Sequence, residues 1–327
     1  MNAAPTPKLD LSVIICAHNP RPAYMQRTLR ALADQTLPMD RWELLVIDNA
    51  SKEELIHKYR LDWHPNARCL REDELGLTAA RVRGIVESRS TLLVFVDDDN
   101  VLSPDYLESA LKIVTEYPWL GVYGASRILP EYEEQPSPEL NRYLYMLALR
   151  NSERDLFANL QGLTAATPYG AGLCVRAEVG QKLVASKRAG GVMFDRKGKD
   201  LFSSGDLEFS LVAADCGLGQ GVFRRLSLTH LIPAERVRID YLVRLAEGMN
   251  YSNNLLNRLR SRELGEPPRS IIKEIGMMLN VVFRTAKARG VHRRFEWRSG
   301  CGRVKAFRRF RRIAKETVPQ QQTNPTM

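Results

Sequence analysis

The chain has 327 residues, of which 44% are hydrophobic and 26% are charged, a composition typical of a soluble globular protein with one large or two smaller domains. Its five cysteines are scattered, odd in number and without CxxC spacing, which argues against a disulfide framework or a zinc knuckle and favours a reducing, cytoplasmic compartment. The N-terminal segment lacks the apolar region of a signal peptide, and no stretch approaches the ~18 consecutive apolar residues of a membrane span. We therefore expect a protein that is neither secreted through a signal peptide nor integral to a membrane.

The net charge of +10 is unevenly distributed along the chain. Residues Arg284 to Lys315 contain thirteen Lys or Arg and a single acid, Glu296, which gives this segment a charge of +12 and leaves −2 for the rest. The basic character is therefore a property of the C-terminal tail, and the remainder of the chain is nearly neutral.

Two apolar runs near the N-terminus predict buried strands joined by a helix. Leu11–Cys16 is the first strand, and Trp42–Ile47 is the second, which ends at Asp48. Between them, Tyr24–Gln35 carries apolar residues at helical spacing. A strand, a helix and a strand in this order predict a right-handed parallel crossover.

The run Thr91–Val96 is apolar on both alternations, which predicts a strand buried on both faces of a parallel sheet. It ends in three adjacent carboxylates, Asp97, Asp98 and Asp99. A polar turn explains one Asp or Asn at such a position, but not three charges that repel one another. Open α/β sheets bind ligands beyond the carboxyl ends of their strands, so this position suits a hard cation that carries a phosphate ligand.

The rest of the pattern predicts further short strands and a largely helical C-terminal part. Helices are expected at Leu77–Val86, Pro104–Tyr117, Tyr143–Leu149, Asp206–Cys216, Ile239–Leu259 and Ile271–Val282. Strands are expected at Gly121–Ser126, at Leu173–Val175 and within Gly219–Leu228. Pro130–Pro138 is predicted as a solvated connection, and Lys187–Lys199 as a mobile basic loop.

Two nucleotide-binding classes are excluded by the residues that follow the first strand, where neither a GxGxxG fingerprint nor a GxxxxGK[ST] phosphate loop is present. Asp97–Leu102 also fits the DxDxVL pattern of haloacid-dehalogenase-like phosphatases, with Asp97 as nucleophile and Asp99 as acid or base. The second acidic pair that this class needs does not follow in the expected form. The tail, with aromatic residues among its arginines, leaves nucleic-acid binding as a further alternative.

Five segments in order give the chain a resemblance to the family 2 glycosyltransferases of GT-A fold. They are LSVIICAHNP with the second-strand Asp48, the segment GLTAAR, VDDD as the DxD motif, YGAGLCVR, and SGDLEF as the counterpart of the family's ED motif. The resemblance covers about Leu11 to Arg236. It implies a GT-A α/β fold, in which helices flank a mixed, mainly parallel sheet, and a nucleotide-sugar donor.

The resemblance also implies roles for individual residues. Asp206 would be the catalytic base, Glu208 and Gly172 would contact the acceptor, and the metal would be bound by Asp99 and His230. The residues implied at the nucleotide-sugar donor are Ala17, Asn19, Asp48, Arg81, Asp97 and Asp98. One departure from the family pattern is that Gly205 stands where many members have the Glu of the ED motif, so the two acids here are Asp206 and Glu208.

The chemistry of sugar transfer calls for the same residue types. A nucleoside diphosphate leaves with developing negative charge, and a divalent ion held by carboxylates stabilises that charge. The attacking hydroxyl must lose its proton, so a carboxylate is needed as general base. We therefore predict Mg²⁺ or Mn²⁺ as the cofactor.

These inferences combine into one hypothesis for the whole chain. Residues 8–236 are expected to form a GT-A glycosyltransferase domain, and residues 237–327 a helical region with the basic tail. The enzyme is expected to be metal-dependent and inverting, and to serve polysaccharide or glycolipid biosynthesis. It would move a sugar, with a UDP-sugar as the first candidate donor, to a glycan or lipid-linked acceptor, and nucleic acid is not expected as a partner.

The basic tail carries a separate prediction about location. Arg284–Arg312 is expected to dock the enzyme as a peripheral protein on the anionic inner face of a membrane. The expected interfacial anchors are the aromatic residues among the arginines, namely Phe295, Trp297, Phe307 and Phe310. The alternative is a solvated, partly disordered extension.

Overall fold

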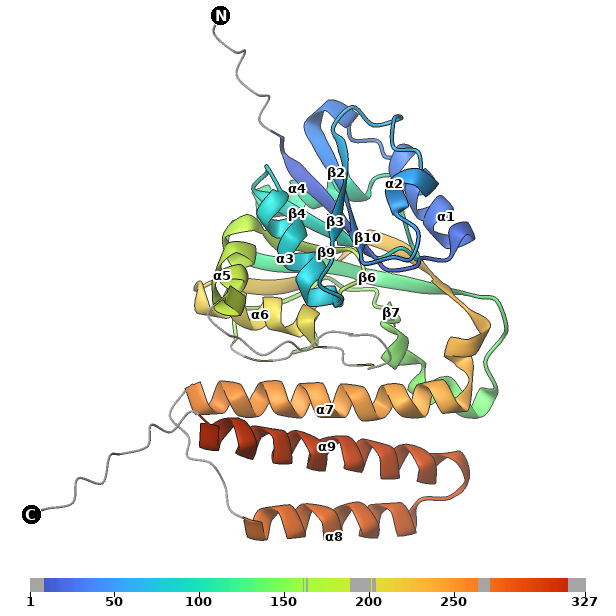
Figure 1. Cartoon of the computed structure of the whole chain (residues 1–327), viewed down its shortest axis with the longest axis vertical. Helices are drawn as coiled ribbons and strands as arrows, with labels where there is room; N and C mark the ends of the chain where they lie inside the picture. Colours follow the sequence, from blue (N-terminus) through green and yellow to red (C-terminus); the bar gives the residue numbers. More distant parts are fainter. Residues whose placement is uncertain are drawn as a thin grey trace, which may run out of the picture. The chain divides into compact units, whose positions relative to one another are not determined.

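A mixed sheet organises the first of the two compact units of the chain (Figure 1). This computed structural model describes residues 9–160, 162, 164–188, 201, 204–263 and 271–316. The first unit comprises residues 1–199 and 205–238, and the second comprises residues 200–204 and 239–327. We keep the division at residue 236, which the sequence suggests, as a proposal for the domain boundary.

Ten strands in the described part of the chain form the sheet. Eight of them follow the order β3-β2-β1-β4-β9-β6-β10-β5, while β7 pairs with β6 and β8 pairs with β10. Their bounds are β1 Leu11–Ala17, β2 Trp42–Asn49, β3 Ala67–Glu72, β4 Leu92–Val96, β5 Asn100–Leu102, β6 Leu120–Tyr132, β7 Arg150–Asn151, β8 Leu156–Ala158, β9 Leu173–Arg176 and β10 Gly219–Ile232.

Parallel pairing dominates the N-terminal half of the sheet. β1 lies between β2 and β4 and is parallel to both, and β2 is parallel to β3. The short strand β9 is antiparallel to β4 and to β6, whereas β6 and β10 pair in parallel. The expected α/β fold with a mixed, mainly parallel sheet is therefore confirmed.

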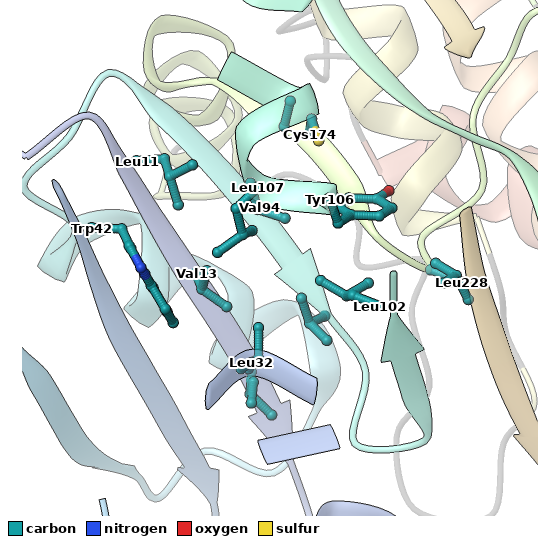
Figure 2. Close-up of a cluster of buried hydrophobic side chains, with 14 of the residues drawn as sticks. Leu11, Val13, Leu32, Trp42, Val94, Leu102, Tyr106, Leu107, Cys174 and Leu228 are labelled. Carbon is teal, nitrogen blue, oxygen red and sulfur yellow. The ribbon is translucent and has the colours of Figure 1, made fainter. Parts of the chain in front are cut away.

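Helices cover both faces of the sheet (Figure 1). α1 (Pro22–Ala33) and α4 (Tyr106–Glu116) pack on one face together with Leu11 and Val13 of β1. α3 (Leu77–Glu87), α5 (Ala177–Arg188) and α6 (Gly205–Asp215) pack on the other face, together with Ile14. Figure 2 shows the first core, with Val13 and Val94 from neighbouring strands. Successive residues of β1 face opposite cores, which is why its sequence is almost entirely apolar.

The structure differs from the predicted elements where pairing with distant strands determines the backbone. β3 and the three-residue β5 are absent from the sequence-based prediction. β6 continues through Pro130 to Tyr132, so the solvated connection expected at Pro130–Pro138 is wrong for its first residues. β10 is one long strand rather than several short ones. Of the loop expected at Lys187–Lys199, residues 187 and 188 belong to α5, and the remainder lies outside the described residues.

Three helices make up most of the described part of the second unit. They are α7 (Ile239–Glu263), α8 (Ile271–Lys287) and α9 (Gly290–Glu316), and α9 contacts both of the others (Figure 1). The basic tail is therefore a packed helix through residue 316, and the alternative of a disordered extension is wrong for that part of it. Within the described residues, no helix combines the length and the apolar character that a membrane crossing needs.

The aromatic residues of the tail have mostly a packing role. Phe295, Phe307 and Phe310 are only 3%, 0% and 5% exposed, so the prediction that they anchor the protein at a membrane interface is wrong. Phe307 and Phe310 share a helical face with the buried Val304 and Ala314, which is the pattern of a core-facing stripe. Trp297, by contrast, is exposed.

Asp48, at the end of β2, joins this strand to the segment that follows it. The carboxylate is buried and accepts hydrogen bonds from the backbone N–H groups of Ser51 and Leu55, at 3.1 and 3.2 Å, and from Nη1 of Arg71 at 2.8 Å. Burial acts to raise the pKa of Asp48, but the hydrogen bonds from Ser51, Arg71 and Leu55 outweigh it, so the pKa lies below its ordinary value. The charged carboxylate is thus part of the local fold.

Replacing this carboxylate by an amide should make stability less dependent on pH. We expect Asp48→Asn to lower the free energy of unfolding near neutral pH by roughly 1–3 kcal/mol, because one acceptor oxygen is lost inside a buried network. A lowered pKa in the folded state stabilises the protein above the pKa of the unfolded chain, and this contribution disappears as the pH falls. The difference in the free energy of unfolding between parent and variant should therefore become smaller below about pH 4. Denaturant unfolding at several pH values measures this difference.

The matched control is Asp34→Asn, which removes a carboxylate whose ion pair with Arg30 is exposed. Exposed pairs contribute little, so this variant should differ from the parent by less than about 0.5 kcal/mol at every pH. If the free energies of unfolding of the parent and Asp48→Asn differ by the same amount from neutral to acidic pH, the role of the charged carboxylate is contradicted.

Candidate active site

The register of the central strands brings the predicted site residues to one edge of the sheet. Ala17 at the end of β1 is opposite Asp48 of β2, and Ile15 is opposite Val96 at the end of β4. Because β9 is antiparallel to β4, with Leu173 opposite Phe95, the loop that precedes β9 lies at this same edge. The three carboxylates, the strand ends and the YGAG loop therefore meet where α/β sheets bind ligands.

The three carboxylates occupy the tight turn between β4 and β5. The backbone N–H of Asn100 donates to the carbonyl of Asp97 at 3.1 Å, and the carbonyl of Asp98 accepts from the Thr28 hydroxyl at 3.1 Å. The carbonyl of Asp99 accepts from the N–H of Leu231 in β10 at 2.9 Å. Hydrogen bonds to its carbonyl groups from α1 and β10, with one inside the turn, thus hold the turn in place.

Asp99 lies beside His230 and Arg236, and all three come from the same unit. Both Asp99 and His230 are 6% exposed, and Oδ2 of Asp99 is 3.5 Å from Nε2 of His230. Nη1 of Arg236 donates to the same carboxylate oxygen at 2.9 Å, while Oδ1 accepts from the amide of Asn100 at 3.0 Å. The structure therefore brings the two predicted metal ligands together and adds a guanidinium at the carboxylate that they share.

The crowding of the carboxylates has an electrostatic cost. Burial, together with the charges of Asp99 and Asp97, raises the pKa of Asp98 to about 7, and Arg236 opposes this rise. A single guanidinium is therefore too little positive charge for three adjacent acids. This turn would be relieved by a further cation.

Asp206 lies in the first turn of α6 and is tied to the loop before β9. Its Oδ2 accepts from the backbone N–H of Gly170 at 2.9 Å, and its Oδ1 accepts from the N–H of Leu207 at 2.9 Å. A helix N-terminus favours a charged carboxylate. Because Gly170 precedes β9, this contact places Asp206 at the edge that bears the Asp97–Asp99 turn.

Arg81 of α3 lies at the same place. Its side chain is buried and stands over the ring of Phe95, with Cζ 5.9 Å from the ring centroid. A Cβ atom on Gly170 would come within 3.1 Å of Nη2 of Arg81 and within 3.6 Å of Oδ2 of Asp206. Gly170 thus lies beside both the guanidinium of Arg81 and the carboxylate of Asp206, and a larger side chain there would disturb both.

Glu208, expected at the acceptor, is engaged by a lysine. Its Oε1 is 2.6 Å from Nζ of Lys187, and the two side chains are 14% and 4% exposed. A buried pair of this kind fixes α5 against α6, since removing either partner leaves a buried charge. This pairing supplies a structural reason for Glu208.

Gly172 has a packing role that accounts for the glycine. Its φ is +68°, in the left-handed region, and a Cβ there would overlap the hydroxyl of Tyr106 and the side chain of Leu228. Its carbonyl accepts a hydrogen bond from Tyr106 at 2.7 Å. The acceptor contact expected for Gly172 stays a prediction.

The loop after β1 contacts the loop after β2. The N–H of Asn19 donates to the hydroxyl of Ser51 at 3.0 Å, and its Oδ1 accepts from the N–H of Lys52 at 2.9 Å. Asn19 has a positive φ of 48°, which asparagine tolerates better than most residues. Asn19 and Asp48 therefore order the same pair of loops at the end of β1 and β2.

Three further residues of the site have no role in the sequence-based prediction. Arg236 lies 137 positions from Asp99, and no local pattern links them. Lys187 lies at the end of α5, in a stretch predicted as a loop. Asn49 is buried beside Asp48 and donates to the carbonyl of Glu74 at 2.7 Å, and its position in the Asp48–Ser51 stretch after a buried strand is the one signal that points to it.

The residues at the turn fit a divalent ion in an open site. At metal–ligand distances of about 2.0–2.3 Å, two atoms that are 3.5 Å apart can contact one ion, as Oδ2 of Asp99 and Nε2 of His230 would. Nδ1 of His230 is buried and has no hydrogen-bond partner in the described part of the chain. Within that part, no cluster of three or more His, Cys, Asp or Glu side chains forms a closed metal site, so the remaining ligands would be phosphates and water.

The chain is similar in sequence to curated glycosyltransferases. It is 29% identical over 108 residues to glycosyltransferase AglE of Haloferax volcanii, a match that covers 32% of this chain and 35% of that protein. It is 24% identical over 151 residues to the putative glycosyltransferase EpsH of Bacillus subtilis, which covers 41% and 42% of the two chains. The match therefore spans well under half the length of either relative.

A solved structure resembles the whole chain more loosely. The structure of S. aureus TarS 1-349 in complex with UDP-GlcNAc has a TM-score of 0.47 to this protein and 14% sequence identity, and the match covers 92% of each chain.

The most direct comparison is with a family model. Residues 12–173 match the model described as glycosyl transferase family 2. This region runs from β1 to the start of β9 and includes Asp48, Arg81 and the Asp97–Asp99 turn. The α/β sheet with helices on both faces is the GT-A fold expected from the sequence. Residues 12–173 therefore form a domain of glycosyl transferase family 2.

Proposed function

We propose that this enzyme is a metal-dependent, inverting glycosyltransferase that uses a nucleotide sugar, with a UDP-sugar as the first candidate, and a glycan or lipid-linked acceptor. One observation carries the proposal. The contact between Asp206 and Gly170, together with the pairing of β9 with β4, brings a carboxylate on a helix N-terminus to the edge that bears the Asp97–Asp99 turn. This geometry supports a donor site and a general base at one sheet edge.

The donor side of the site is built from the strand ends. Asp48, Asn19 and Ala17 border the position at which a nucleoside would lie beyond β1 and β2. Asp97 and Asp98 would contact the ribose and the sugar, and Asp99 with His230 would hold Mg²⁺ or Mn²⁺. A bound divalent ion would act as a Lewis acid that stabilises the charge of the leaving diphosphate.

Arg236 is proposed to bind the diphosphate of the donor. Nη1 of Arg236 is 2.9 Å from Oδ2 of Asp99, the proposed metal ligand. A guanidinium binds phosphate oxygens with two parallel hydrogen bonds, so Arg236 is suited to turn to the donor diphosphate. Arg81 supplies a second, buried guanidinium close to the base.

Asp206 is suited to act as the general base. The N–H groups of Gly170 and Leu207 each bind one oxygen, which fixes the plane of the carboxylate. The proton of the acceptor hydroxyl passes to Asp206 while the hydroxyl oxygen attacks the anomeric carbon. Attack from the side opposite the leaving diphosphate inverts this centre.

Two alternatives find less support. A haloacid-dehalogenase-like phosphatase needs Asp97 as a nucleophile, but the family 2 match covers this motif. Nucleic-acid binding through the described part of the tail has Trp297 as its single exposed aromatic for base stacking, because Phe295, Phe307 and Phe310 are buried.

The metal dependence can be tested by donor binding alone. We expect UDP to bind the full chain by isothermal titration calorimetry in the presence of Mn²⁺, and the affinity to fall on the order of 10- to 100-fold in Asp99→Asn, because one ligand of the ion is lost. Asp105→Asn, which changes an exposed acid just before α4, should bind as the parent does. Equal affinity of the parent for UDP in Mn²⁺ and in excess chelator would remove the ion from the donor site.

The assignment of the base can be tested by separating chemistry from binding. Asp206→Asn retains one acceptor oxygen for the backbone but loses basicity, so it should lower kcat by ~10² to 10⁴ and leave UDP binding within about twofold. Asp215→Asn, at the other end of α6, should keep the parental rate. Sugar transfer by Asp206→Asn at the parental rate would show that another group removes the proton.

A further inference from the structure

The outward side of α8 is an apolar surface with no covering element among the described residues. Val281 is buried, but six large apolar side chains of the same helix are between 47% and 76% exposed. We call these residues the α8 face, and they are Ile272, Ile275, Met278, Leu279, Val282 and Phe283. They recur every three or four positions, so they lie side by side along the helix.

The inner side of α8 is held by contacts that leave this surface free. Val281 packs against Gly300 of α9, where any added Cβ would overlap it. Glu274 accepts hydrogen bonds from Arg308 at 2.7 Å and from Arg311 at 2.9 Å. A helix in a water-soluble protein normally turns its apolar stripe toward the core. In α8 the inner side carries Glu274, Val281 and the half-buried Met277, whereas most of the large apolar side chains face outward.

An exposed stripe of this kind indicates a binding surface. Monomeric soluble proteins rarely expose a contiguous apolar patch larger than a few hundred Å². Of the other exposed large apolar residues of the described chain, Ile56 in α2 (Leu55–Lys58) and Val86 in α3 lie singly, and Trp119 and Phe157 form a pair with ring centroids 5.7 Å apart. The α8 face is thus the main exposed apolar surface in the described part of the protein.

Positive charge surrounds the α8 face. Lys273 and Lys287 are exposed on α8 itself, and Ile271–Glu316 contains fourteen Lys or Arg against three Glu, a charge of +11. At the C-terminal end of α8, a groove of about 490 Å³ is lined by Val282, Thr285, Ala286, Gly290, Arg293, Arg294 and Trp297. Trp297 is 47% exposed there, and an amphipathic ring beside arginines is typical of the interface between water and lipid.

The charge decides which occupant fits this surface. A second copy of the chain would bring two segments of +11 together and would be repelled. An anionic bilayer offers acyl chains for the apolar stripe and phosphates for the surrounding cations. We propose that the α8 face is a docking surface for an anionic lipid bilayer, into which its apolar side chains insert while Lys273, Lys287 and Arg293 contact lipid phosphates. This assigns docking to α8 instead of the aromatic residues of α9.

The test is co-sedimentation of the full chain with vesicles. The parent protein should bind vesicles of phosphatidylglycerol mixed into phosphatidylcholine, and should stay in solution with phosphatidylcholine alone. Ile275→Ser should lower the partition coefficient on the order of tenfold, because one inserted side chain is lost. Ile56→Ser is the matched control, since the two isoleucines are 55% and 52% exposed, and it should bind as the parent does.

A second pair of variants separates the charge from the apolar contact. Lys273→Glu with Lys287→Glu should reduce binding at low salt and lower its salt dependence. All variants change exposed side chains, so their thermal unfolding should match that of the parent, and a variant that does not is replaced by Leu279→Ser.

Three results would overturn the proposal. The first is failure of the parent to bind the anionic vesicles. The second is equal binding by Ile275→Ser and Ile56→Ser. The third is a lipid-free dimer, seen by sedimentation equilibrium, that Ile275→Ser dissociates and Ile56→Ser does not, because the face would then join two copies of the chain. None of these readouts depends on sugar transfer, so the docking surface and the enzymatic function can fail separately.

Discussion

Three carboxylates are confined to a tight turn at the end of a strand that is buried on both faces. Their repulsion is visible in Asp98, whose pKa is raised to about 7 by burial and by its two neighbours. Thr28 of α1 and Leu231 of β10 nevertheless donate hydrogen bonds to the backbone of the turn, which keeps the three carboxylates close together. The negative charge of the turn therefore favours a nearby cation, and Arg236 neutralises part of this charge.

The rest of the domain places the other proposed site residues around this turn. β1 and β2 end beside it and carry Asn19 and Asp48, which order the loops where a nucleoside would lie. β9 is antiparallel to β4, so the loop that precedes β9 lies at the same edge of the sheet. Gly170 in that loop binds Asp206, and the absence of a side chain leaves room for Arg81. A short antiparallel strand thus connects the DxD turn to the proposed base.

The central strands could be predicted from the sequence because their apolar residues face two cores. β1, β2 and β4 are apolar at nearly every position, which is typical of short strands covered on both faces. β3 is an edge strand with the half-polar sequence ARCLRE, and the three-residue β5 exists through its pairing with β10, so local sequence contains little signal for either.

The site could be predicted in its motifs but not in its pairings. The acids stand out because three charges follow a buried strand. Arg236 could not be found, because its contact with Asp99 depends on how β10 returns to β5. In the tail, the many arginines mask the helical spacing of Phe307, Phe310 and Ala314, which marks a core stripe. The apolar pattern of α8 is visible in the sequence, but only tertiary structure tells which side of a helix is covered.

We propose that the Asp97–Asp99 turn holds a divalent ion together with a nucleoside diphosphate, and that Arg236 then turns from Asp99 to a phosphate. A crystal structure of the protein with Mn²⁺ and UDP tests this most directly, because the anomalous signal of manganese locates the ion. We expect manganese bound by Asp99 and His230, with the guanidinium of Arg236 moved from Asp99 to a phosphate. Nucleotide bound without manganese at this turn, while Arg236 still pairs with Asp99, would contradict it.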